Sequence, residues 1–253
     1  PIVSPFSAAP MLIAKPPLPD GTPQYRVVLD FRRLNAMTEK DTYPLPRVDE
    51  NLAKLGKAKF FTTIDLLMGF HQVELEESSI PKTAFSTPWG QFAYTRMPMG
   101  LTSSPSAFMR VVDATLRGLP PNIALAYCDD VIIYTDGDLE QHMVDVGKVF
   151  DKLIEGGFTV KCSKVHIGKS EVPYLGFMVG RYGTRPIESK VEPIRNMTVA
   201  AMQKDPKVAS RFAGMIGVYQ KFIDKCQNIL APFHELKAKK SDARAITTSL
   251  RFI

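Results

Sequence analysis

Two adjacent acidic residues, Asp129 and Asp130, stand between two short apolar segments, and this arrangement limits the folds open to the chain more than any other feature. Residues 123–127 and 131–135 are apolar and are predicted as two β-strands. The two strands then form a β-hairpin with both acids at its tip. Like charges this close repel each other, and a divalent cation relieves the repulsion best. The alternative is a solvated turn, since acids are common in hairpin loops.

A third acid, Asp65, lies near the end of residues 60–66, a segment of aromatic and β-branched residues that is predicted as a buried strand. From a neighbouring strand Asp65 can reach the same site as the two hairpin acids. Three carboxylates on adjacent strand ends can bind two metal ions about 3.5–4 Å apart and support an in-line phosphoryl displacement. Oxygen ligands of this kind suit Mg²⁺. Taken alone, Asp65 is more often a cap or a turn former.

The rest of the chain predicts an α+β protein. The proline-rich residues 1–25 and 41–47 are expected to be extended. The predicted helices cover 105–117 (with Ser104 as N-cap), 139–154 and a third segment that begins at Asp205-Pro206. The other predicted strands are 11–14 paired with 25–30, and 73–75, 83–86, 91–96, 159–161, 165–167 and a hairpin through 172–179.

Composition narrows the class of protein. The chain has 253 residues, of which 45% are hydrophobic and 23% are charged, a composition typical of globular proteins. Its net charge of +6 weakly favours an anionic partner. Cys128, Cys162 and Cys226 are odd in number and widely spaced, which argues against a secreted disulfide framework. No apolar run approaches the roughly 20 residues of a membrane span, so we expect no membrane partner. The start at Pro1 rather than Met favours a fragment or a processed product.

A series of ordered motifs carries a resemblance to a known family. The motifs are residues 25–35 (YRVVLDFRRLN), 43–47 (YPLPR), 64–66 (IDL), 69–72 (GFHQ), 82–85 (KTAF), 97–101 (MPMGL), 127–130 (YCDD) and 174–176 (YLG). The YCDD segment resembles the Tyr-X-Asp-Asp signature of reverse transcriptases. The order and spacing over residues 4–236 are similar to those of gypsy-like long-terminal-repeat retrotransposons.

This resemblance implies an α+β right-hand polymerase fold, with fingers, a palm built on an antiparallel sheet, and a helical thumb. The implied segments are fingers 1–57 and 76–98, palm 58–75 and 99–180 including a primer-grip hairpin, thumb 181–236, and a truncated or irregular end at 237–253. The implied protein is the polymerase portion of a Pol polyprotein, whose RNase H and integrase segments lie elsewhere. It is expected inside the cell, in the cytoplasm.

The implied activity is that of an RNA-directed DNA polymerase that copies an RNA or DNA template. Asp65, Asp129 and Asp130 would hold two Mg²⁺ ions, with Mn²⁺ as a substitute, while the primer 3′-hydroxyl attacks the α-phosphate of a dNTP. Phe70, five residues after Asp65, corresponds to the aromatic steric gate that clashes with a ribose 2′-hydroxyl. For a lone Phe, a place in the core is the competing interpretation.

Three further residues are implied at the nucleotide. Arg26 follows an aromatic residue, as the triphosphate-binding Arg of the family does, and its guanidinium suits bidentate contact with phosphate. Lys15 is implied as a second phosphate contact, although Pro16 and Pro17 follow where relatives carry more lysines and a solvated lysine is equally expected. Met99 occupies the position before Gly100 where relatives carry Gln or Phe against the nucleotide.

The resemblance also implies contacts to the primer and template. Tyr127 and Cys128 would lie at the primer end, with Cys128 as a reactive or fidelity-setting residue. Leu175 and Gly176 would position the primer through their backbone, for which glycine permits close approach. A plain β-turn is the alternative for this pair.

The third predicted helix also carries three basic residues, Lys207, Arg211 and Lys221. The resemblance implies contact between these residues and the template–primer duplex, and a solvated charged face is the alternative. Two other functions remain open from sequence alone: a non-catalytic remnant, and a polymerase that makes RNA from an RNA template.

Overall fold

The computed structural model of the chain describes residues 1–237, which fall into two compact units. Unit 1 comprises Pro1–Tyr174 and Gly180–Tyr182, and unit 2 comprises Leu175–Val179 and the chain from Gly183 onward. No helix within residues 1–237 combines the length and the apolar character needed to cross a membrane.

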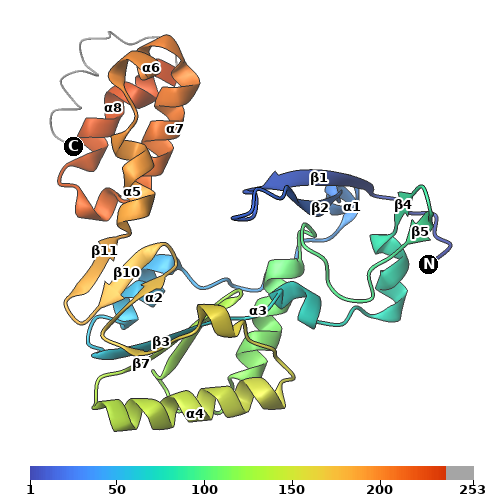
Figure 1. Cartoon of the computed structure of the whole chain (residues 1–253), viewed down its shortest axis with the longest axis horizontal. Coiled ribbons are helices and arrows are strands. Elements are labelled where there is room, and N and C mark those ends of the chain that lie inside the picture. The colour runs from blue at the N-terminus through green and yellow to red at the C-terminus, as the bar shows by residue number, and fades with distance from the viewer. Residues whose placement is uncertain (238–253) are drawn as a thin grey trace. The chain divides into compact units, whose positions relative to one another are not determined.

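Unit 1 contains short strands and four helices (Figure 1). The strands are β1 (Ala9–Lys15), β2 (Gln24–Asp30), β3 (Phe60–Asp65), β4 (Phe85–Thr87), β5 (Gly90–Phe92), β6 (Ala124–Tyr127), β7 (Asp130–Thr135), β8 (His166–Lys169) and β9 (Glu171–Tyr174). The helices are α1 (Arg32–Met37), α2 (Val48–Lys54), α3 (Ser104–Thr115) and α4 (Leu139–Glu155), with 3₁₀ turns η1 (Gly69–Gln72), η2 (Glu77–Thr83) and η3 (Cys162–Lys164).

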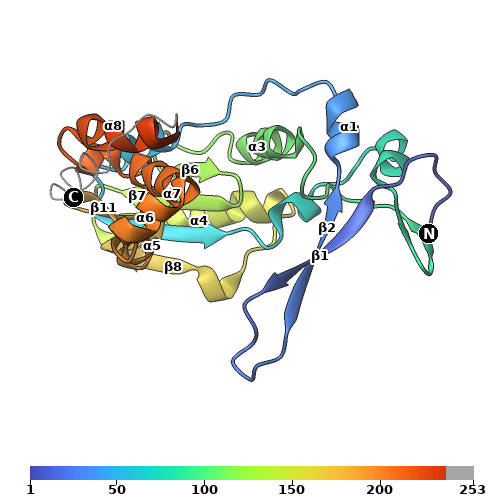
Figure 2. The same ribbon diagram turned by 90° about the horizontal axis from the view of Figure 1, so that it is seen from above.

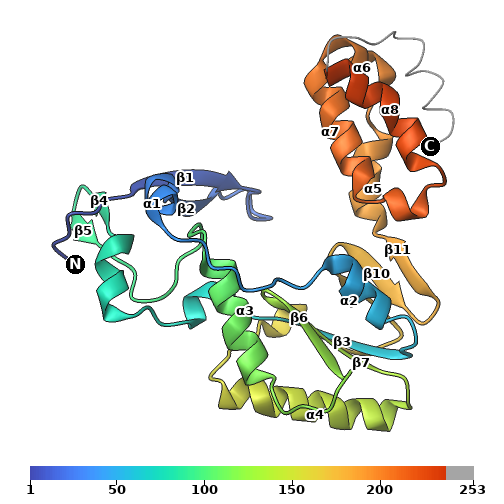
Figure 3. The ribbon, with the colours of Figure 1, turned by 180° about the vertical axis from the view of Figure 1, so that it is seen from behind.

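The core of unit 1 is a four-stranded sheet of order β6-β7-β3-β8. Both β6 and β3 pair with β7 in antiparallel fashion. In Figures 1 and 3 helix α4 runs along one face of this sheet. Ile64 and Val131 of the strands pack in one apolar cluster with Phe108 of α3 and Val149 of α4. The packed sheet therefore fixes the positions of the residues at its strand ends.

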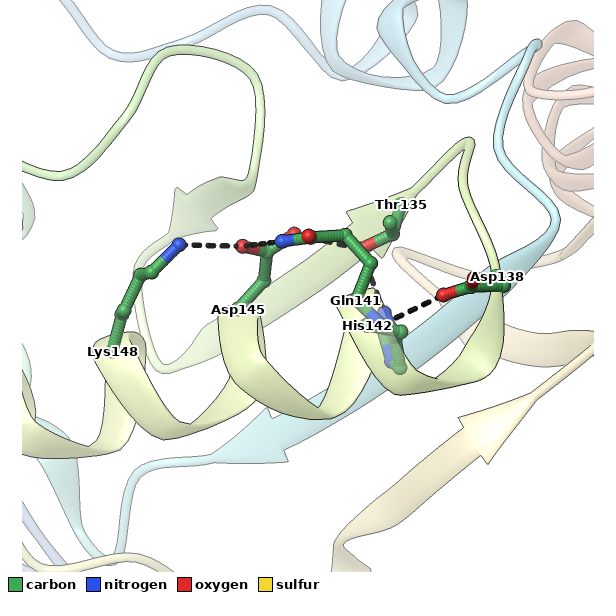
Figure 4. Close-up of polar contacts among 6 residues, drawn as sticks. All are labelled: Thr135, Asp138, Gln141, His142, Asp145 and Lys148. Carbon is green, nitrogen blue, oxygen red and sulfur yellow. Dashed lines mark hydrogen bonds and ion pairs between the residues drawn. The ribbon is translucent and has the colours of Figure 1, made fainter.

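A buried polar network fixes α4 to the sheet, and Figure 4 shows the part that lies on and beside the helix. His142 is fully buried, with Nε2 2.8 Å from the hydroxyl of Thr62 on β3 and Nδ1 2.9 Å from the hydroxyl of Thr135 on β7. The Thr135 hydroxyl is also 3.2 Å from a carboxylate oxygen of Asp145. The backbone N–H of Gly168 donates to the Thr62 hydroxyl at 3.0 Å.

These bonds are mutually consistent for one tautomer of His142. A carboxylate only accepts, so Thr135 donates to Asp145 and accepts from an Nδ1–H of His142. The unprotonated Nε2 then accepts from Thr62, which in turn accepts from Gly168. Burial lowers the pKa of His142, which agrees with a neutral ring. In this network the ring nitrogens of His142 and the hydroxyls of Thr62 and Thr135 therefore all have partners.

Strands β1 and β2 form an antiparallel hairpin, with Ala9 opposite Asp30 and Lys15 opposite Gln24. Every residue of β1 is exposed, and Figure 2 shows the hairpin projecting from the rest of unit 1. The segment before β1 is tied to the β4–β5 region, for example by the 2.7 Å bond from the Ala8 N–H to the Ala84 carbonyl.

Unit 2 is mainly helical. Its elements are β11 (Gly183–Pro186), α5 (Glu188–Arg195), α6 (Val199–Lys204), α7 (Pro206–Gly217), the 3₁₀ turn η4 (Gln220–Phe222), α8 (Cys226–Lys237) and the first three residues of β10 (Phe177–Gly180). The side chain of Asp205 caps α7 by accepting from the Lys207 N–H at 2.8 Å. Phe212 and Phe233 pack with their ring centroids 5.1 Å apart in the core between α7 and α8.

The predicted hairpins, the strand at 60–66 and the three long helices are confirmed. The predicted strands at 73–75 and 159–161 are wrong, because each holds only an isolated bridge. Ser104 is not the N-cap of α3. Ser103 has that position, and the buried Ser104 hydroxyl donates to the carbonyl of Pro98 at 3.0 Å. The expected irregular end at 237–253 lies outside the described residues apart from Lys237, and the division into fingers, palm and thumb segments stays a prediction.

Candidate active site

The turn between β6 and β7 presents two acids in different environments. Tyr127 pairs with Asp130, so Cys128 and Asp129 are the two central residues of the turn. Cys128 has φ 50° and Asp129 has a negative φ, the pattern of a type II′ turn. The Cys128 N–H donates to the sulfur of Met109 on α3 at 3.0 Å. Asp129 is partly buried and Asp130 is exposed.

Strand β3 brings the third acid to the same end of the sheet. Asp65, its last residue, lies directly opposite Asp130 of β7. One residue further on, the N–H of Leu66 donates to the backbone carbonyl of Asp129 at 2.9 Å. Side chains of directly opposed residues are about 4.5–5.5 Å apart at Cβ. The three acids expected to act together are thus brought together by strand pairing.

The charged form of Asp129 is disfavoured by its surroundings. Its pKa is raised from 3.8 to about 6, mainly by burial and then by the charges of Asp130 and Asp65. Its Oδ1 atom is buried and finds no hydrogen-bond partner among the residues that the structure describes. A buried carboxylate oxygen without a donor is costly in a folded protein. This oxygen therefore marks a position where a cation fits.

Lys164 in η3 is a cation at this site that no sequence motif marks. Its Nζ lies 2.6 Å from Oδ2 of Asp65, and this hydrogen bond raises the pKa of the lysine. A pocket of about 180 Å³ runs beside the pair, lined also by Asp130, His166 and Tyr174. Asp65 and Lys164 are separated by 99 positions in the sequence, which explains why no local pattern predicted the contact.

The acids suit a hard divalent cation in their chemistry. Their donor atoms are all carboxylate oxygens, the ligands that Mg²⁺ prefers, and one of them is buried and unpartnered. Within residues 1–237 no set of three His, Cys, Asp or Glu side chains is already arranged around a metal position. Asp65 in particular is engaged by Lys164. The residues present therefore fit the metal, provided that the lysine gives way.

Gly69, in the GFHQ motif, packs closely against the side chain of Asp129. A Cβ atom on Gly69 would lie 2.3 Å from Asp129 Oδ1 and 2.9 Å from the ring of Phe108. This glycine belongs to a motif of the sequence, but the motif alone indicates no role for it. The next residue, Phe70, is partly buried and meets Phe108 edge-on with ring centroids 5.3 Å apart. Gly69 thus allows the Phe70 segment to pack directly against the acid.

The expected nucleotide-binding residues lie on two segments. In the β1–β2 register Arg26 stands opposite Ile13, and Lys15 follows two residues later on the same strand, so Arg26 and Lys15 share one face of the hairpin. Both are exposed. Met99 lies in the loop before α3 and is 43% exposed.

The expected primer-binding residues are divided between the units. Tyr127 and Cys128 belong to the hairpin of unit 1, where burial, followed by the charges of Asp129 and Asp130, raises the pKa of the Cys128 thiol and disfavours a reactive thiolate. Leu175 and Gly176 belong to unit 2 and both have positive φ, 46° and 87°, which is the pattern of a type I′ turn.

Of the three basic residues expected at the duplex, Lys207 and Arg211 lie on α7 and are exposed. Lys221 lies beyond α7, in η4. Its ammonium sits over the rings of Phe177 and Phe222, 4.5 and 5.1 Å from their centroids, so it has a structural contact within unit 2.

Comparison with known proteins shows the family to which the chain is similar. The family model described as "Reverse transcriptase (RNA-dependent DNA polymerase)" matches residues 13–179. The Pol polyprotein of the Drosophila melanogaster transposon 297 is 39% identical over 94% of this chain and 22% of its own length. That of the Drosophila melanogaster transposon gypsy is 38% identical over 85% of this chain and 20% of its own length.

Among solved structures, the foamy viral protease–reverse transcriptase in complex with double-stranded DNA superposes with a TM-score of 0.84 at 25% identity. The match covers 99% of this chain and 44% of that one. The chain spans less than a quarter of the length of the curated relatives that it matches. It has the polymerase fold that the motifs predicted, and it belongs to the reverse transcriptase family, with homology to gypsy-like transposon Pol polyproteins.

Proposed function

We propose that the chain is an RNA-directed DNA polymerase that adds dNTPs to a primer 3′ end on an RNA or DNA template, as one part of a retrotransposon polyprotein. The observation that carries this proposal is the meeting of Asp65, Asp129 and Asp130 at one end of the sheet, with a buried Asp129 oxygen that has no partner in the described chain. The RNase H and integrase segments would lie elsewhere in that polyprotein, and the site of action would be the cytoplasm.

Asp65, Asp129 and Asp130 would hold two Mg²⁺ ions, or Mn²⁺ in their place. When bound, such ions stabilise the charge on the attacking and leaving oxygens of an in-line phosphoryl transfer. The chain itself must first deprotonate Asp129, whose pKa is about 6. It must also release Asp65 from Lys164, so that the carboxylate is free to act as a ligand.

The substrate residues follow from the faces on which they lie. Arg26 and Lys15 would contact the triphosphate from their common face of the β1–β2 hairpin, where a guanidinium gives bidentate contacts. Phe70 would lie under the sugar, held by its edge-on contact with Phe108, and exclude a ribose 2′-hydroxyl. Met99 would add an apolar contact to the nucleotide.

The template–primer duplex would meet the chain at two turns. Tyr127 and Cys128 would lie at the primer end, and Leu175 and Gly176 would position the primer through their backbone. The foamy viral neighbour, solved with double-stranded DNA, supports a duplex as the partner. The net charge of +6 is in keeping with that partner.

The decisive experiment is primer extension on an RNA template with Mg²⁺ and dNTPs, with Asp129→Asn as the matched variant. We expect extension by the wild type and its loss in the variant, while both bind the template–primer with equal affinity in a fluorescence anisotropy assay. No extension by the wild type would leave a non-catalytic remnant as the better description. Equal loss of binding would assign Asp129 to folding rather than to chemistry.

The sugar gate has its own test. Replacement of Phe70 by Ala removes the ring and should let ribonucleotides into the product, which is measured by extension with each nucleotide type. Free entry of ribonucleotides into the wild type would contradict the gate and favour a polymerase that makes RNA.

A further inference from the structure

Asn35 is the last residue of the YRVVLDFRRLN motif, and its side chain crosses from α1 to the loop that carries Met99. Its Nδ2 donates to the carbonyl of Gly100 at 2.8 Å, and its Oδ1 accepts from the Thr102 N–H at 2.9 Å. One amide thus satisfies a donor and an acceptor of a segment about 65 residues away. Only a side chain with a donor and an acceptor at this length can make both bonds.

The loop from Met97 to Thr102 is held on both sides of Met99. On the N-terminal side Met97 is buried in the core, and its N–H donates to the Val73 carbonyl at 2.9 Å. On the C-terminal side Gly100 has φ 96° and receives the Asn35 bond. The backbone at Met99 is therefore fixed from two directions, while its side chain stays 43% exposed.

The two anchors come from different parts of unit 1. The first belongs to the core beneath the loop. The second belongs to the segment in which β2 passes through Phe31 into α1, and β2 carries Arg26. The loop also lies against this segment directly, since a Cβ on Gly100 would be 3.6 Å from the ring of Phe31.

We infer that Asn35 is a positioning residue that fixes the Met99 loop against the β2–α1 segment and so sets the spacing between Met99 and Arg26 for an incoming dNTP. This inference rests on the proposed polymerase function. A misplacement of about 1 Å in such a constellation can cost on the order of 100-fold in rate. A bond that only stabilised the fold would instead lower thermal stability and leave the nucleotide dependence unchanged.

The test is Asn35→Ala in the whole chain, with primer extension measured as a function of dNTP concentration. We expect KM for the dNTP to rise about 10-fold or more with a much smaller change in kcat, and the template–primer Kd to stay within about twofold. Thr38→Val is the matched control, because Thr38 ends the same helix and its hydroxyl donates only to the Leu34 carbonyl. It should leave KM unchanged.

A second variant approaches the same loop from the other side. Gly100→Ala forces a side chain onto a backbone with φ 96° and should reproduce the KM defect. If both variants break one contact, the double variant should be little worse than either single one, whereas independent sites would multiply their effects. Multiplicative effects, or a fall in kcat at constant KM, would overturn the inference.

Direct binding of a fluorescent dNTP to the protein–template–primer complex separates this inference from the proposal on which it rests. Weaker binding by Asn35→Ala than by the wild type supports the positioning role even if extension is slow. Equal binding by the two overturns the positioning role alone. If the wild type binds no nucleotide, both the inference and the polymerase proposal fall.

Discussion

Strands β3 and β7 carry two polar sites of opposite character. At the end formed by Asp65 and Asp130 the acids repel one another, and a buried oxygen of Asp129 has no partner among the described residues. Elsewhere on the same strands Thr62 and Thr135 meet His142 in a network in which each donor has an acceptor. Satisfied polar groups specify how a helix docks, whereas unsatisfied charge is tolerated only where a ligand repays the cost.

The backbone shows the same contrast. Two non-glycine residues beside the acids, Met68 and Cys128, have positive φ, at 51° and 50°. Such conformations cost about 1–3 kcal/mol each and persist where the surrounding structure enforces them. None of the residues of the His142 network has a positive φ apart from Gly168. Two residues with positive φ and the unpaired carboxylate oxygen therefore lie near the same end of the sheet, which is the end that the proposed function uses.

The largest expected effect on activity is that of Gly69→Ala, which disturbs the acidic end of the sheet and not the His142 network. The new methyl group would lie 2.3 Å from Asp129 Oδ1, so the carboxylate must move away from the site. Gly69 has a negative φ, so alanine is acceptable to the backbone and the effect is purely steric. We expect primer extension to fall by about 100-fold or more, as judged by kcat/KM.

Gly147→Ala on α4 is the control for this change. Nothing lies within 4 Å of a Cβ at that position, and alanine favours a helix interior over glycine by about 1 kcal/mol. The control should keep full extension activity and melt at the same or a higher temperature. Near-normal extension by Gly69→Ala would show that Asp129 does not need its present position.

The next largest effect is expected in the satisfied network, where Thr62→Val keeps the shape of the side chain and removes its hydroxyl. Both the Gly168 N–H and Nε2 of His142 then lose a partner. Leaving a buried polar group unsatisfied costs about 1–3 kcal/mol. We expect unfolding in denaturant to show a loss of about 2 kcal/mol. The primer-extension rate of the folded fraction should not change, and a proportional loss of rate would argue that the two sites are coupled.

Local sequence patterns predicted most of the long helices and strands of the structure. The apolar stretches of β3, β6 and β7 and the helical spacing in α3 and α4 depend on neighbouring residues alone. The failures at 73–75 and 159–161 have another cause. These segments are β-prone, but each meets its partner at one residue only, and pairing is decided by tertiary contacts. Helices α1 and α2 were missed because six or seven residues are too few to show a period.

The residues of the candidate site also differ in whether a local sequence pattern could predict them. Asp65, Asp129 and Asp130 were predictable because a short motif marks each of them and strand pairing unites them. The contacts of Lys164 with Asp65 and of Gly69 with Asp129 join segments remote in sequence, and no periodicity reports them. The same holds for Asn35, which the motif contained and to which the sequence assigned no partner.

A smaller effect on stability is expected from Asp129→Asn in the metal-free chain. The pKa of Asp129 is raised, so its charged form destabilises the folded state at neutral pH, and an uncharged amide removes that cost. We expect the free energy of unfolding at pH 7 in EDTA to rise by about 1 kcal/mol, a value discounted because the carboxyl is only partly buried. Thermal melts with and without Mg²⁺ measure it.

Asp151→Asn, which changes an exposed carboxylate on α4, should leave the melt unchanged. Mg²⁺ should stabilise the wild type and not Asp129→Asn, because only the wild type keeps the full set of ligands. A lower melting temperature for Asp129→Asn in EDTA would contradict the view that the acidic end is held at a cost.

The smallest effect concerns pH and sets the two sites against each other. The pKa of Asp129 in the folded state is raised from 3.8 to about 6. The contribution of the protonated carboxyl to folding stability is therefore complete below pH 3.8 and is lost as the pH rises through about 6. The pKa of His142 in the folded state is lowered from its ordinary value of 6.5. The contribution of the neutral ring to folding stability is therefore present above pH 6.5 and is lost on acidification. Both variants of the chain keep His142, and so its term cancels when wild type and Asp129→Asn are compared. The stability difference should therefore be near zero below about pH 3 and reach its full value by about pH 7.5, in melts recorded in EDTA. A difference that stays constant over this range would mean that the asparagine acts through packing, and that the cost of ionising Asp129 is not what distinguishes this end of the sheet from the His142 network.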